Sequence, residues 1–233
     1  MSFGNAASVS PARLRTELAV RLDGAAAAWL EDAVAAVARQ PALLHRLFPE
    51  AGRRCGRTVM ADEPLVCGGT PAEVLWWTVD DAVRALLLAA VPSPALCPEA
   101  EALYHGGDAG ERRAVLRALG AVAPGGGAVA LAADALRTHD SRLVAAALGP
   151  YGARHLDPHT HRHGVLKCLH LGIPLHAIAL PRARRDAELD RMARAHAREL
   201  SSAGRPVPAD LWLLVRPHSI PGNRCASSTR TSI

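Results

Sequence analysis

Aromatic residues and lysine are both scarce in this chain of 233 residues. Phe, Trp and Tyr together make up only 3% of the sequence, and the single lysine is Lys167. Apolar residues nevertheless account for 49%, and alanine dominates them. Alanine favours helices, whereas sheets favour β-branched and aromatic residues. The composition therefore predicts closely packed helices, and the length suits one well-buried domain or at most two small ones.

The sequence also contains no long hydrophobic segment. Its longest uninterrupted apolar run, Ala85–Val91, is far shorter than the roughly 20 residues that span a bilayer as a helix. The N-terminal residues have no hydrophobic core of a signal peptide. We therefore expect a cytosolic protein that does not span a membrane.

The motifs of several enzyme classes are missing as well. Five cysteines, an odd number with no Cys-x-x-Cys pair, indicate reduced thiols instead of a disulfide framework or a zinc site. Gly125–Gly127 precedes a predicted helix but follows no predicted strand, so this segment is interpreted as a linker and not as a phosphate loop. Neither a Ser nucleophile elbow nor a His-Glu-x-x-His motif occurs. We expect no cofactor and no bound metal, and a non-enzymatic role is favoured.

The net charge of +5 is a feature that DNA-binding proteins share. However, residues 216–233 contain three arginines and no acid, which leaves a charge of about +2 for the rest of the chain. Duplex binding requires a cationic face. The nearly neutral remainder therefore argues against binding to nucleic acid.

Helix start and stop signals occur along most of the chain. The candidate N-caps are Ser10, Asp23, Thr78 (with Asp81 three residues later), Asp108, Asp140 and Asp157. The predicted helices include residues 11–22, 24–39 and 43–48, an apolar and central helix from Thr78 to Val91, a helix that ends at Gly106, and helices at 182–203 and 208–214, the last with Trp212 as a packing anchor.

The spacing of two caps suggests a repeat. Asp108 and Asp140 lie 32 residues apart, and each opens the second helix of a predicted hairpin, as in helical-hairpin repeats. We predict an all-α, HEAT-like repeat solenoid that forms a single domain over residues 10–214. Residues 1–9 and 215–233 lack apolar periodicity and are predicted to be disordered.

An irregular segment at residues 50–69 holds the first candidate binding residues, Arg53, Arg54 and Arg57. Arginine offers a rigid fork of donors to phosphate or carboxylate groups, and long loops often carry function. Alternatively, these arginines are solvated or pair with Asp80 and Asp81.

The predicted helix turns hold the second group. Their arginines are expected either to line one concave face of the solenoid or to form salt bridges with the capping aspartates. The residues considered at the turns are Tyr104, Asp108, Arg112, Arg113, Arg137, Asp140, Arg142 and Tyr151, and the cap role is sufficient to explain Asp108 and Asp140. The candidate set is completed by Trp77, Asp80, Asp81 and Lys167.

A histidine stripe follows Pro158. On a helix, His159, His163, Lys167 and His170 fall within ~80° of one another. Two histidines at positions i and i+4 can share a metal. This stripe contains no acid, and Lys167 lies in its middle. We therefore interpret it as a solvated face and predict no metal site.

Several short segments follow one another in a distinctive order. They are Trp77–Ala82, Asp108–Ala118, Ala135–Leu143, Ala146–Tyr151, Val165–Cys168 and Gly172–Leu175. Together they resemble the EboA family of bacterial metabolite-traffic proteins, over roughly Pro11 to Leu214. His139 stands where relatives are expected to have Asn. The resemblance implies a helper that is encoded beside a prenyltransferase-like membrane protein and several metal-dependent enzyme-like proteins. That gene set is associated with moving a secondary-metabolite precursor out of the cytosol, and the resemblance implies no catalytic residues.

We therefore expect a cytosolic, non-enzymatic adaptor that binds a small metabolite or a co-encoded partner protein on a helical-repeat surface. The alternative is a HEAT-like DNA-binding protein or DNA glycosylase, in which Trp77, Asp80 and Arg142 supply the aromatic, acidic and basic side chains. A metal-dependent hydrolase or isomerase is a third class, but the sequence lacks the cluster of carboxylates and histidines that it requires.

Overall fold

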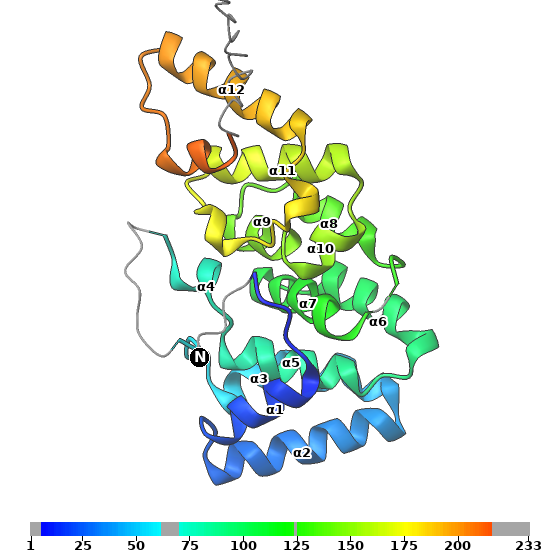
Figure 1. Ribbon diagram of the computed structural model, residues 1–233. Coiled ribbons are helices and arrows are strands. Elements are labelled where there is room, and N and C mark those ends of the chain that lie inside the picture. The colour runs from blue at the N-terminus through cyan, green and yellow to red at the C-terminus, as the bar shows by residue number, and fades with distance from the viewer. Residues whose placement is uncertain (1–5, 62–69, 124, 216–233) are drawn as a thin grey trace, which may run out of the picture. The chain divides into compact units, whose positions relative to one another are not determined.

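The computed structural model describes residues 6–61, 70–123 and 125–215. Within these ranges the chain forms twelve α-helices, four 3₁₀ helices and no strand, and Val59 and Thr78 form one isolated antiparallel bridge (Figure 1). The all-helical prediction is confirmed. None of the helices described is both long enough and apolar enough to cross a bilayer.

The α-helices are α1 (Pro11–Ala19), α2 (Gly24–Arg39), α3 (Leu44–Cys55), α4 (Ala72–Leu75), α5 (Val79–Ala89), α6 (Ser93–Gly106), α7 (Ala109–Val122), α8 (Val129–Ala135), α9 (Ser141–Ala147), α10 (Pro150–His155), α11 (Pro158–His170) and α12 (Ala187–Ser202). The 3₁₀ helices are η1 (Pro41–Leu43), η2 (Leu175–Ala177), η3 (Arg182–Arg184) and η4 (Ala209–Leu213).

The chain divides into two compact units, Met1–Asp186 and Ala187–Ile233. The boundary falls inside the range over which a single domain was expected. In the first unit, α5 packs against α1, α3 and α7, and α7 packs in turn against α9 (Figure 1). In the second unit, α12 packs against η4.

The predicted N-caps position most of these helices. Ser10, Asp23, Asp108, Asp140 and Asp157 each accept a hydrogen bond from a backbone N–H in the first turn of the helix that follows. These bonds satisfy N–H groups that have no acceptor within the helix. The segment after α9 is more broken than the sequence suggested, since Gly149 and Pro150 begin the separate short helix α10.

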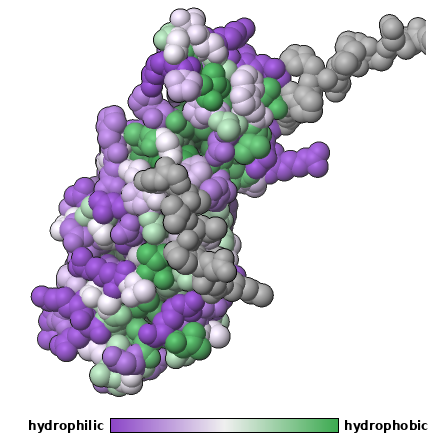
Figure 2. Space-filling view, turned by 90° about the vertical axis from the view of Figure 1, so that its left-hand side faces the viewer, coloured by the Kyte–Doolittle hydropathy of each residue, from purple (hydrophilic) through white to green (hydrophobic). Residues whose placement is uncertain are grey.

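Helix α5 is buried along nearly its whole length. Every residue from Val79 to Leu88 is buried, which confirms that the helix is central. On the face seen in Figure 2, hydrophilic residues occupy much of the surface and hydrophobic residues show between them. A fully buried helix that contains charged residues must pair each charge inside the protein, and the site described below depends on that requirement.

The second unit departs from the prediction in two ways. The predicted helix 182–203 is divided, because Arg182–Arg184 forms η3 and α12 begins only at Ala187. Trp212 is not a packing anchor, since it is 55% exposed whereas Leu211 is fully buried. The reason is that residues 209–213 form a 3₁₀ helix, in which side chains three apart share one side. Leu211 and Leu214 therefore point inward, and Trp212 does not.

The predicted disordered ends lie mostly outside the described residues, which exclude 1–5 and 216–233. Within the N-terminal segment, Val9 is buried.

Candidate functional site

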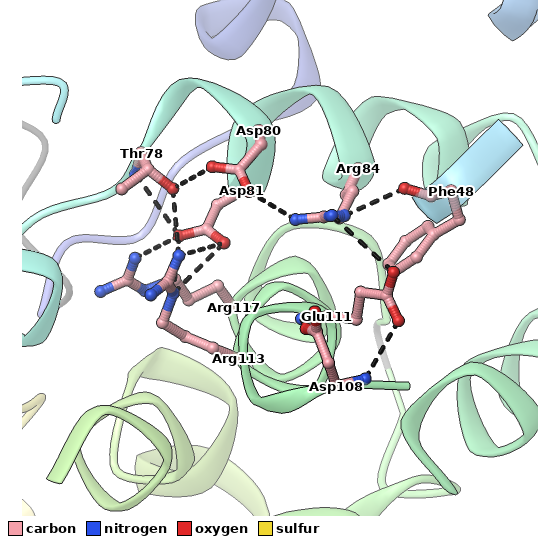
Figure 3. Close-up of polar contacts among 9 residues, drawn as sticks. All are labelled: Phe48, Thr78, Asp80, Asp81, Arg84, Asp108, Glu111, Arg113 and Arg117. Carbon is pink, nitrogen blue, oxygen red and sulfur yellow. Dashed lines mark hydrogen bonds and ion pairs between the residues drawn. The ribbon is translucent and has the colours of Figure 1, made fainter. Parts of the chain in front are cut away.

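A cluster of buried charges joins α5 to α7 (Figure 3). It consists of Thr78, Asp80, Asp81, Arg84, Arg113 and Arg117, and is called the buried ion cluster below. Each of its charged members is at most 5% exposed. Thr78 opens α5, and its N–H donates to the Asp81 carboxylate at 3.4 Å, as predicted for a capping box.

Asp81 lies between two arginines of α7. The Arg113 Nε donates to Asp81 Oδ2 at 3.1 Å and its Nη2 donates to Oδ1 at 3.2 Å, while Arg117 Nη1 donates to Oδ2. Burial alone would raise the pKa of Asp81, but the charges of Arg117 and Arg113 outweigh burial and hold the pKa below its ordinary value. Asp81 is therefore a charged group that holds α5 and α7 together.

Asp80 and Arg84 form the second pair of the cluster. Arg84 Nη1 donates to Asp80 Oδ2 at 2.6 Å, and Arg84 Nε donates to the carbonyl of Phe48 in α3 at 3.0 Å. The Thr78 hydroxyl donates to Asp80 Oδ1 at 2.6 Å. Arg84 also lies 3.9 Å from Glu111 at the start of α7. These contacts lock α3, α5 and α7 into one arrangement.

A pocket of about 300 Å³ opens beside the buried ion cluster. Its lining combines four arginines with three acids and the first residues of α7: Arg57, Glu73, Thr78, Asp80, Arg84, Asp108, Ala109, Gly110, Arg113 and Arg142. The volume lies at the lower end of the range for small-molecule sites. The lining is more polar than that of a typical drug pocket, so this pocket suits a small, polar ligand.

The segment after α3 brings Arg57 to this pocket. Helix α3 ends at Cys55, and Gly56 takes a φ of 84°, which only glycine adopts readily. The chain then pairs with the start of α5, where Met60 N–H donates to the Trp77 carbonyl and Val79 N–H donates to the Thr58 carbonyl. Arg57 immediately precedes this pairing and is thereby held near the N-terminal end of α5.

The three arginines predicted to act together are separated by the structure. Arg53 and Arg54 lie in the last turn of α3, are exposed and do not line the pocket. Arg54 instead approaches Glu50 at 3.4 Å. Burial raises the pKa of the neighbouring Cys55 to about 11, and the charges of Asp23 and Asp80 act in the same direction. Cys55 is therefore a thiol at neutral pH and a poor nucleophile.

Asp140 holds Arg142, which also lines the pocket. Asp140 Oδ1 accepts from the Arg142 backbone N–H at 2.9 Å and from its Nε at 3.0 Å, and Oδ2 accepts from Nη2 at 2.7 Å. The pKa of Arg142 is raised, first by its hydrogen bond to Asp140 and then by the charges of Asp140, Glu73 and Asp108. Arg142 is thus surrounded by acids, which already balance its charge.

Asp140 is expected to act as a helix cap. Its hydrogen bonds with Arg142 hold its pKa below the ordinary value despite partial burial. Replacing Asp140 with Ala should therefore lower the free energy of unfolding by about 1 kcal/mol, as loss of an N-cap does. Thermal melts at neutral pH check this value. An unchanged or higher melting temperature would instead favour a strained acid kept for binding a ligand.

Most of the other candidate residues have structural contacts away from the pocket. The Tyr104 hydroxyl donates to Asp134 at 2.9 Å, and Arg137 pairs with the same Asp134. Arg112 lies over the Tyr104 ring, with its guanidinium carbon 5.5 Å from the ring centroid. Trp77 is buried, and the Arg117 guanidinium lies 6.0 Å from its ring centroid.

Tyr151 and Lys167 each hold a turn of the backbone. The Tyr151 hydroxyl donates to the Gly125 carbonyl and accepts from the Ala128 N–H, both at 3.0 Å. Lys167 Nζ donates to the Leu136 carbonyl at 2.8 Å, just after α8 ends. Both side chains therefore connect segments that lie far apart in the sequence.

The histidine stripe on α11 is largely exposed. The rings of His159 and His163 lie 4.3 Å apart between centroids. Among the residues that the structure describes, no group of three or more His, Cys, Asp and Glu side chains is placed to hold a metal ion. His161, which points away from the stripe, is completely buried.

Comparison with known proteins gives one positive result. Residues 11–216 match the family of the metabolite traffic protein EboA. The chain belongs to the EboA family. No curated protein and no solved structure gives a significant match to the sequence.

In this EboA-family chain the pocket includes residues that sequence reasoning did not select. Arg84 was missed because it lies inside the predicted central helix, and Glu73 because no motif contains it. Asp108 was considered but explained as the cap of α7, and Ala109 and Gly110 carry no polar side chain that would have drawn attention to them. A charged residue such as Arg84 inside the apolar period of a central helix was the one available signal, because such a charge needs a buried partner.

Proposed function

We propose that this EboA-family chain is a non-enzymatic, cytosolic helper in the traffic of a secondary-metabolite precursor. The single observation that carries the proposal is the pocket of about 300 Å³ beside the buried ion cluster. The pocket or its rim binds either the metabolite or a partner protein. Candidate partners are the products of the co-encoded gene set, including the prenyltransferase-like membrane protein.

Two of the three acids that line the pocket are already held by structural hydrogen bonds, which favours binding over catalysis at these two residues. The Asp80 carboxylate already accepts from Arg84 and Thr78. Asp108 accepts from the Glu111 N–H at 2.8 Å, and the Glu111 carboxylate accepts from the Asp108 N–H at 3.1 Å. A general base needs a free lone pair and a pKa near neutrality, and these two carboxylates are committed to structural bonds.

We also propose that α6–α9 form helical-hairpin repeats. In support, Asp108 and Asp140 are the N-caps of α7 and α9, and each accepts a hydrogen bond from a backbone N–H of the first turn. Those two helices also pack against each other. The pocket then lies where successive second helices of the repeats begin.

The alternative of a DNA glycosylase finds less support. Asp80 and Arg142 line the same pocket, but Trp77 does not line it and is only 2% exposed. An aromatic side chain that is packed inside the protein cannot stack on a flipped base. A gel-shift assay at low salt tests this alternative directly, because non-specific DNA binding is strongest there.

The proposed function is tested by purifying the chain from its native host and analysing what accompanies it by mass spectrometry. We expect a small molecule or a product of the co-encoded genes to accompany the unchanged chain and the control variant Arg53→Glu, whose site lies outside the pocket. Neither a small molecule nor a co-encoded product should accompany the variant Arg57→Glu. The proposal would be contradicted if nothing accompanied any of the three proteins, or if Arg53→Glu and Arg57→Glu retained the same amount of the bound molecule or protein.

A further inference from the structure

We infer that the pocket binds the anionic group of a small molecule, a carboxylate or a phosphate, between Arg57, Arg113 and the first turn of α7, with a hydrogen-bond donor of the same molecule directed at Glu73. This inference rests on the proposed function and specifies the chemical class of its ligand. It follows from which polar groups of the pocket are already paired and which are not.

Arg57 is the first unpaired donor. Among the residues that the structure describes, it has no hydrogen-bond or ion-pair partner, although it lines the pocket. Its side chain lies over Gly52 of α3, where a Cβ would come within 2.7 Å of Arg57 Nε. The absence of a side chain at Gly52 therefore leaves the space in which the Arg57 guanidinium rests.

Arg113 supplies the second donor from the buried ion cluster. Its Nε and Nη2 are hydrogen-bonded to Asp81 and Thr78. Its Nη1 makes no hydrogen bond within the described part of the chain. Arg113 is 5% exposed, and it lines the pocket. A guanidinium fixed by two bonds presents its remaining N–H groups in a set direction, as anion recognition requires.

The start of α7 adds backbone donors. Ala109 and Gly110 line the pocket, and the first N–H groups of any helix have no acceptor within it. The Asp108 carboxylate satisfies the N–H of Glu111, one residue further on. The N–H groups of Ala109 and Gly110 are thus available in the same lining as the two arginines, which explains why the anionic group is assigned to these residues.

Other residues of the same lining have the reverse chemistry. Arg142 is balanced by Asp140, and the charges of Glu73 and Asp108 act on it as well. Within the described residues, the Glu73 carboxylate has no hydrogen-bond or ion-pair partner, and it lines the pocket. An acid in this position accepts an ammonium or hydroxyl group of the ligand, so the ligand carries a donor beside its anion.

The first experiment measures binding of inorganic phosphate and of acetate to the full chain by isothermal titration calorimetry. The variant Arg57→Gln and the control Arg53→Gln make the same change in charge, but only Arg57 lines the pocket. We expect saturable binding to the unchanged chain and to Arg53→Gln, and about tenfold weaker binding to Arg57→Gln, the value of one charged hydrogen bond. Binding of phosphate alone or acetate alone identifies which anion the site takes.

Two further variants test the geometry without changing the charge. Gly52→Ala should displace Arg57 and weaken binding of the anion. Ala109→Pro removes one N–H at the first position of α7, where proline is well tolerated and where the preceding residue Asp108 is already extended. We expect it to weaken binding while leaving the melting temperature unchanged.

The role of Glu73 is tested with phosphoethanolamine and methyl phosphate. The former should bind more tightly than the latter, and the difference should disappear in Glu73→Gln. The inference is overturned if no anion shows saturable binding, or if Arg57→Gln and Arg53→Gln bind alike. Should the simple anions fail while the host metabolite still depends on Arg57, the inference is wrong and the proposed function stands.

Discussion

Replacing Asp81 with Ala should lower the free energy of unfolding by about 3–5 kcal/mol, the range for breaking a buried ion pair. Asp81 is fully buried and accepts hydrogen bonds from both Arg113 and Arg117. Its removal leaves the guanidiniums of Arg113 and Arg117 buried without the carboxylate that they share. The loss should exceed that of any exposed ion pair, because water cannot solvate the remaining charges.

Urea denaturation of Asp81→Ala and of a matched control measures this difference. In the control, Glu31→Ala, an acid is removed from an ion pair with Arg15 whose side chains are 66% and 43% exposed. An exposed pair contributes at most about 1 kcal/mol. If Asp81→Ala cost no more than Glu31→Ala, Asp81 would not be the group that holds α5 to α7.

Lowering the pH should reduce the difference in the free energy of unfolding between Asp81→Ala and the unchanged chain. The pKa of Asp81 is lower in the folded protein than its ordinary value of 3.8. Its stabilising effect is therefore fully present above the unfolded value, and it is lost as the pH falls through the folded pKa. Denaturation curves collected below pH 3.8 should bring the two proteins closer together.

The local parts of this structure were accessible from the sequence. The caps Ser10, Asp23, Asp108, Asp140 and Asp157 were all identified, because a cap depends on residues two or three positions apart. The all-helical fold followed from composition and periodicity. What the sequence did not reveal was which charges pair over long distances along the chain.

The buried ion cluster illustrates that limit. Asp81 and Arg113 were both selected as candidates, but they lie 32 residues apart and no local pattern joins them. One of the alternatives left open by the sequence was that Arg53, Arg54 and Arg57 pair with Asp80 and Asp81. In the folded chain Arg84, Arg113 and Arg117 fill that role, and of the first three only Arg57 lines the pocket.

His161 should make the protein less stable at mildly acidic pH. Its side chain is completely buried in α11, and neither ring nitrogen has a hydrogen-bond partner of normal geometry among the described residues. Burial is the main reason that its pKa falls from 6.5 to about 4, and the charge of Arg184 adds to the effect. The folded protein therefore keeps this histidine neutral through a pH range in which the unfolded chain protonates it.

The direction of the effect follows from proton binding. Between pH 6.5 and about 4 the unfolded chain binds more protons at this residue than the folded chain does, so lowering the pH favours unfolding. At about 1.4 kcal/mol per pKa unit, the free energy of unfolding should fall by up to about 3 kcal/mol across that interval. The Ala179 backbone and the charge of Asp186 act to raise the pKa of His161, and they therefore make this fall in stability smaller.

Urea denaturation at a series of pH values, with His161→Leu and His163→Leu compared, tests this prediction. His163 lies on the same helix but is exposed, so removing it should preserve the loss of stability on acidification. His161→Leu should flatten the pH dependence between pH 6.5 and 4. At neutral pH it should be as stable as the unchanged chain or more so, because leucine leaves no buried nitrogen without a partner. Equal slopes for the two variants would show that the buried ring does not control stability in this range.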